Sequence, residues 1–156
     1  MAILNIRREG DPILRKTSRP VDEITPRIRT LIRDMIETMR NANGCGLAAV
    51  QVGVLRRIVV IEVEDGQVFT MVNPRIVKRE GKQEEVEGCL SLPGKWGITE
   101  RPETVTVRAT DENGEKYELR GSGLLARAIC HETDHLDGKL FTDVMIREVK
   151  QEDTEN

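Results

Sequence analysis

The two histidines of the chain, His131 and His135, are four residues apart in a segment that predicts a helix. This spacing places both imidazoles on one face, one turn apart, where they can bind a single metal ion. Glu132 follows the first histidine and can reach a water molecule on that ion without being a ligand. In this HExxH arrangement the glutamate is a general base toward the metal-bound water. The sequence therefore predicts a hydrolytic metal site.

A catalytic site of this kind needs a third protein ligand and one position for water. The chain has three cysteines, which are the candidates. Cys130 directly precedes His131 and points about 100° around the helix from it, so we interpret it as a small buried side chain. Cys45 lies between two glycines, and Cys89 follows Gly88. Spacing alone does not choose between these two thiols.

Size and composition set limits on what the chain can be. Its 156 residues are enough for one domain, which we expect to span 1–156. A net charge of -3 and 3% aromatic residues argue against direct nucleic-acid readout. No apolar run approaches the roughly 20 residues that cross a bilayer, and the N-terminus lacks the apolar stretch of a signal peptide. With an odd number of cysteines, these features predict a cytoplasmic protein with reduced thiols.

The elements that must position the site follow from hydrophobic spacing. Apolar residues recur at helical intervals over Pro26–Arg40, with Thr25 as the cap. Alternating and β-branched residues, with turn residues between them, predict strands. These strands span Arg57–Val63, Gln67–Val77, Glu103–Thr110 and Glu115–Arg120. Strands in the middle and helices near both ends indicate an α+β domain.

The helix that carries the histidines is expected to begin after Ser122, a possible cap, and to stop at Gly138. Leu124 and Ala128 share its histidine face, so that face is apolar and we expect it to be buried. The polar tail from about 148 to 156 is expected to fray.

Three segments together resemble the peptide deformylase family. They are "GCGLAAVQ" at Gly44–Gln51, "EGCLS" at Glu87–Ser91 and "HETDH" at His131–His135, in the order of the family. "GDPILRK" near the N-terminus and "HLDGKLF" near the C-terminus are also similar, so the resemblance covers nearly the whole chain. It implies mixed or antiparallel strands packed around a central helix that bears HExxH.

The resemblance implies that Cys89, His131 and His135 bind one divalent metal ion. In this family the ion is commonly Fe(II), and zinc, nickel or cobalt can replace it. The implied enzyme is a hydrolase that removes the formyl group from N-formylmethionine at the start of newly made polypeptides and releases formate. Its partners would be formylmethionyl peptides and nascent chains, with the ribosome as a transient partner of a bacterial cytoplasmic enzyme and no membrane.

The resemblance also assigns roles around the metal. Gln51 would offer its side-chain amide, and Leu90 its backbone N–H, to the oxyanion that forms during hydrolysis. The glycine-rich segment with Gly44, Cys45 and Gly46 is expected to lie against the peptide substrate. We also expect an apolar pocket for the methionine side chain near the metal, with Leu124 and Ala128 of the histidine helix, and Trp96, as candidates for its wall. Two positions depart from the family pattern, because Cys130 replaces the usual glutamine and Trp96 stands where some members have arginine.

Three alternatives remain open at this point. The enzyme could hydrolyse another small amide. The metal could be structural, with Cys45 completing a closed shell of four ligands. Cys89 could instead be the nucleophile of a thiol hydrolase that needs no metal.

Overall fold

The computed structural model describes residues 2–150. Its two α-helices are α1 (Pro26–Asn41) and α2 (Leu124–Leu136). Three short 3₁₀ helices are η1 (Pro12–Arg15), η2 (Ala49–Val52) and η3 (Phe141–Asp143). The strands are β1 (Gly46–Ala48), β2 (Ile58–Glu64), β3 (Gln67–Glu80), β4 (Gln83–Cys89), β5 (Leu92–Arg101), β6 (Thr104–Thr110), β7 (Lys116–Ser122) and β8 (Met145–Val149).

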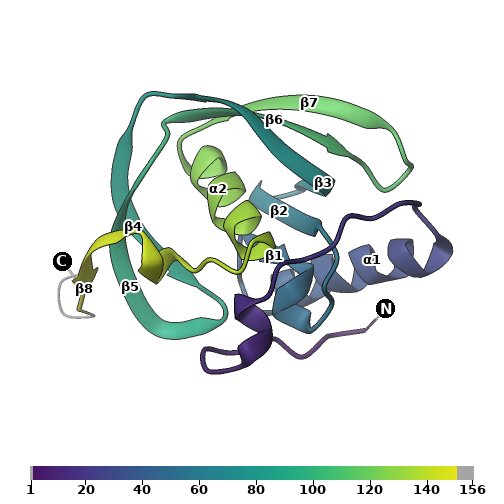
Figure 1. Ribbon diagram of the computed structural model, residues 1–156, viewed down its shortest axis with the longest axis horizontal. Helices are drawn as coiled ribbons and strands as arrows, with labels where there is room; N and C mark the ends of the chain where they lie inside the picture. The colour runs from purple at the N-terminus through teal and green to yellow at the C-terminus, as the bar shows by residue number, and fades with distance from the viewer. Residues whose placement is uncertain (1, 151–156) are drawn as a thin grey trace.

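The strands form two sheets on either side of α2. One sheet has the order β1-β2-β3-β6-β7 and the other has the order β4-β5-β8. Within both sheets the neighbouring strands are antiparallel. Figure 1 shows α2 in the space between the sheets, with α1 on the far side of β1 and β2. The predicted α+β architecture around the HExxH helix is therefore confirmed.

Strand β2 lies between the two helices, which explains why its first four residues, 58–61, are all apolar and buried. Ile58 and Val60 pack in the cluster that contains α1, and Val59 and Ile61 pack in the cluster that contains α2. Because successive side chains of a strand point to opposite faces, both faces of β2 are covered. This packing holds α2, and with it the two histidines, against the five-stranded sheet.

The first helix was predicted closely. Thr25 Oγ1 accepts a hydrogen bond of 3.2 Å from the backbone N–H of Ile28, and Pro26 opens the first turn. The helix ends at Asn41, one residue beyond the predicted end.

The start of α2 corrects one prediction. Ser122 does not cap the helix, because it is the last residue of β7 and its hydroxyl lies 2.8 Å from Thr104 Oγ1 of β6. The cap position is Gly123, whose φ of 62° turns the chain sharply from strand into helix. At the other end, α2 stops at Leu136 and Gly138 has a φ of 74°, which agrees with its expected left-handed conformation.

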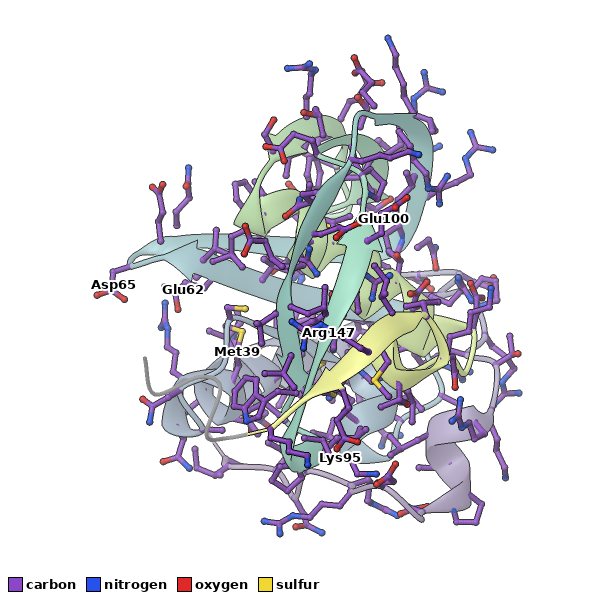
Figure 2. The ribbon with its side chains drawn as sticks, turned by 90° about the vertical axis from the view of Figure 1, so that its left-hand side faces the viewer. Met39, Glu62, Asp65, Lys95, Glu100 and Arg147 are labelled. Carbon is purple, nitrogen blue, oxygen red and sulfur yellow. The ribbon has the colours of Figure 1, made fainter. Side chains whose placement is uncertain are left out.

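The three-stranded sheet was not predicted. Figure 2 views it from outside, with Lys95 and Glu100 toward opposite ends of β5 and Arg147 on β8. Strand β8 also corrects the expected frayed tail, because Val149 is buried and pairs with Trp96 of β5. The rest of that predicted tail, 151–156, lies outside the described residues. Among the described residues, no helix combines the length and the apolar character that crossing a membrane requires.

The turn after α2 generates a prediction on stability. A methyl group at Gly138 would lie 2.5 Å from the backbone oxygen of Arg15, whereas one at Gly114 would meet open space. Both glycines have positive φ, so alanine at either position carries a strain of about 1–2 kcal/mol. We expect Gly138→Ala to lower the free energy of unfolding by about 1–3 kcal/mol more than Gly114→Ala, because backbone must move. Urea unfolding at matched metal content measures the difference, and equal losses would contradict it.

Candidate metal centre

Three ligand atoms from two elements converge beside α2. Cys89 Sγ at the end of β4 lies 3.3 Å from His135 Nε2, which lies 3.2 Å from His131 Nε2. All three atoms lie within 4.8 Å of one another. One thiolate and two imidazoles are a donor set suited to Zn²⁺ and other transition metals. These residues therefore fit the metal ion that the HExxH motif predicts.

Glu87 orients the first histidine. Its Oε2 lies 2.6 Å from His131 Nδ1, and both side chains are buried. A carboxylate accepts the proton of Nδ1, which leaves the lone pair of Nε2 facing the other two ligand atoms. This role of Glu87 was not predicted from the sequence. A signal was present, because Glu87 precedes Cys89 by two residues and residues i and i+2 of a strand share a face.

Three further side chains fix the Glu87 carboxylate. Arg101 donates from Nε to Oε1 at 3.0 Å and from Nη2 to Oε2 at 2.6 Å. Arg127 Nη1 and Thr99 Oγ1 donate to Oε1 at 2.8 and 2.7 Å. Burial raises the pKa of Glu87, but the hydrogen bonds and charges of His131 and Arg101 outweigh it and hold the pKa far below its usual range. Glu87 is therefore a fixed carboxylate.

The groups around the three ligand side chains favour a positive charge among the ligand atoms. Burial lowers the pKa of His131, yet the negative charge of Glu132 and the contacts with Cys89 and Glu87 raise it well above its usual value. Burial and the neighbouring His131 lower the pKa of His135. The anionic groups thus stabilise positive charge among the ligand atoms, where a divalent metal would provide it.

Glu132 faces the same site from α2. Its carboxylate is buried, and Oε1 has no hydrogen-bond partner among the described residues. Burial raises the pKa of Glu132 to about 7, although His131 acts in the opposite direction. A methyl group at Gly46 would lie 2.5 Å from Oε2 of Glu132. The glycine of β1 is therefore required for the carboxylate to occupy this position.

Gln51 of η2 holds a fixed amide next to the ligand thiol. Its Oε1 accepts a hydrogen bond of 2.9 Å from the backbone N–H of Ala48. Its Nε2 donates to Ser91 Oγ at 3.0 Å and lies 3.6 Å from Cys89 Sγ. These contacts direct the amide N–H groups toward the ligand Cys89 and toward Ser91. The part of Ser91 in the site was not predicted from the sequence.

A cavity of about 380 Å³ opens beside these groups. The predicted site residues that line it are Cys89, His131, Glu132, Gln51, Leu90, Gly44, Cys45, Gly46, Leu124, Ala128 and Trp96. His135 does not line it. Cys130 is buried in the main apolar cluster, as interpreted from the sequence. Two other cavities share no lining residue with this one.

Comparison with known proteins gives the family. A family model described as polypeptide deformylase matches residues 3–151. The peptide deformylase of Acetivibrio thermocellus is 55% identical over 155 residues, covering 99% of this chain and 91% of the relative. That of Alkaliphilus metalliredigens is 56% identical, covering 95% and 100%.

Solved structures agree with this match. The crystal structure of a peptide deformylase from Legionella pneumophila has a TM-score of 0.90 at 44% identity and covers 92% of this chain and 86% of that chain. The enzyme from Synechococcus elongatus in complex with actinonin has a TM-score of 0.89 at 40% identity and covers 99% and 84%.

The buried carboxylate generates a prediction on metal affinity. We expect Glu87→Gln to weaken metal binding by about 10–100-fold, because an amide removes the charge that orients and polarises His131. Glu85→Gln is the matched control, since Glu85 lies on the same strand but is exposed. Competition with a chromophoric chelator measures both dissociation constants. Equal affinities in the two variants would contradict the role of Glu87.

Proposed function

The chain belongs to the polypeptide deformylase family, and from this premise we propose how its residues remove the formyl group from N-formylmethionine at the start of new polypeptides. The reaction forms a bond between a water oxygen and the formyl carbon and breaks the bond from that carbon to nitrogen, which gives formate and a free amine. One observation carries the proposal: two of the three ligands, Cys89 and His131, line one cavity together with Glu132 and Gln51, and the third ligand atom, of His135, lies within 4.8 Å of the other two.

We propose that Cys89, His131 and His135 hold one divalent ion, with Fe(II) as the physiological metal. The donor set also suits zinc, nickel or cobalt, so the ligands alone do not select iron. When bound, the ion supplies a Lewis acid that polarises the formyl group and lowers the pKa of water.

Glu132 is the proposed general base. Its carboxylate lies beside His131 and lines the cavity, and its Oε1 is without a partner among the described residues. In this role Glu132 takes a proton from the attacking water and then delivers it to the departing nitrogen. The protein leaves the reaction with the same protonation as at its start.

Gln51 and Leu90 are the proposed donors to the oxyanion. Gln51 is supported by its amide, which Ala48 and Ser91 fix next to Cys89. Leu90 directly follows the ligand thiol, so its backbone N–H lies at the same turn of the chain. Loss of one such donor costs about 3–4 kcal/mol of activation free energy in other hydrolases.

The rest of the cavity is proposed to bind the substrate. Gly44, Cys45 and Gly46 offer a backbone to which an extended peptide can pair. The apolar part of the wall, with Leu124 and Ala128 from α2, is proposed for the methionine side chain, and Trp96 for a further contact.

The proposed setting is the bacterial cytoplasm, where formylated chains emerge. The curated relatives are bacterial. The substrates are then nascent chains, and contact with the ribosome is proposed to be transient.

Glu132→Gln tests the general base. We expect this variant to keep one metal ion per chain and to lose at least about 100-fold in kcat, because an amide cannot accept the proton. Formate release from formyl-Met-Ala, with metal content measured on the same sample, checks both parts. A variant as active as the parent would show that Glu132 is not the base.

Metal removal tests the ion. We expect complete chelation to abolish formate release and Fe(II), added without air, to restore it; acetyl-Met-Ala should not be cleaved in any state. Full activity in the metal-free protein would support Cys89 as a nucleophile instead. Protein purified without air should contain iron in preference to zinc.

A further inference from the structure

Exposed apolar side chains gather around the cavity. Val86 is 40% exposed, Trp96 is 40% exposed and Leu124 is 55% exposed, and all three line it. They come from β4, β5 and α2, and we call them the apolar rim. Exposed apolar residues scattered over a surface need no explanation, but a group around one cavity indicates contact with a ligand.

The indole of Trp96 occupies the space that a side chain at position 88 would fill. A methyl group at Gly88 would lie 2.4 Å from a ring carbon of Trp96, so the ring packs directly on the backbone of β4. The backbone of Trp96 pairs with Val149 of β8. An aromatic ring fixed in this way offers a large contact area at a small cost in conformational entropy.

The Trp96 ring lies close to the proposed metal ligand Cys89. Gly88 directly precedes the ligand Cys89, and successive residues of an extended peptide are about 3.3 Å apart. Ala128 and Arg127, which also line the cavity, are buried, whereas the apolar rim is exposed to solvent. A substrate with its formyl group at the ligands and its methionine in the buried part therefore brings its second residue to the rim.

The lysine and the arginine that line the cavity are each paired with a carboxylate. Lys95 of β5, labelled in Figure 2, has its Nζ 2.8 Å from a carboxylate oxygen of Glu9. Arg127 is paired with Glu87 at 2.8 Å. The three side chains of the rim carry no charge, so the rim suits an apolar side chain.

We propose that Trp96 is a specificity-determining residue whose ring packs against the residue that follows methionine. The enzyme then prefers formyl-Met peptides with a large apolar second residue, such as phenylalanine, to those with glycine or aspartate. This inference rests on the proposed deformylase function of the same site.

Steady-state kinetics of the metal-loaded enzyme test the proposal. The measured quantity is the ratio of kcat/KM for formyl-Met-Phe-amide to that for formyl-Met-Gly-amide. We expect Trp96→Ala to lower this ratio by about three- to tenfold, the range for one aromatic contact, and Trp96→Phe to retain most of it. Ile146→Ala is the matched control, because Ile146 is 56% exposed on the same sheet but does not line the cavity. It should leave the ratio unchanged.

Fluorescence gives a second readout that does not depend on the alanine variant folding. Trp96 is the one tryptophan of the chain, so the emission of the protein reports on this ring. Formyl-Met-Phe-amide, titrated into metal-loaded Glu132→Gln protein, should shift the emission to shorter wavelength as the ring loses water. The shift should be smaller with formyl-Met-Gly-amide.

The outcomes separate this inference from the function on which it rests. Equal losses for both peptides in Trp96→Ala, or unchanged emission when calorimetry shows saturation, would overturn the role of Trp96 while leaving deformylation intact. Absence of formate release from every peptide by the parent enzyme would overturn the proposed function itself.

Discussion

The contact between Glu87 and His131 joins two elements that are 44 residues apart in the sequence. Glu87 lies on β4, two residues before the ligand Cys89, and His131 lies on α2, four residues before the ligand His135. The Glu87 carboxylate therefore links the strand that brings the thiolate to the helix that brings the imidazoles. The rest of the site depends on this pairing, because neither element alone supplies three ligand atoms.

Burying such a carboxylate is costly, and the fold offsets the cost with matched charge. Arg101 bridges Glu87 and Asp134, with Nη1 at 2.8 Å from the latter, and Arg127 adds a second guanidinium. Buried ion pairs contribute little net stability, but removing one partner typically costs about 3–5 kcal/mol. We infer that the network mainly fixes the geometry of the ligands. Glycines complete the arrangement by leaving room for Glu132 at Gly46 and for Trp96 at Gly88.

The sequence predicted α2 and its chemistry because HExxH is local: helical spacing places His131 and His135 on one face, and Glu132 is the residue next to the first of them. The same reasoning could not select the third ligand, since Cys45 and Cys89 both neighbour glycines and only tertiary packing distinguishes them. Strands β4 and β5 were missed for a related reason. Their buried side chains include Glu87, Thr99 and Arg101, so the apolar alternation that marks a strand is absent where polar groups face inward.

The central claim is that one ion is bound by one sulfur and two imidazoles. X-ray absorption spectroscopy of the metal-loaded protein measures this directly, with Cys45→Ala and Cys89→Ala protein for comparison. The account predicts one sulfur and two nitrogen ligands in the parent, an unchanged spectrum for Cys45→Ala and loss of the sulfur contribution for Cys89→Ala. Two sulfur ligands, or a sulfur that persists without Cys89, would contradict it.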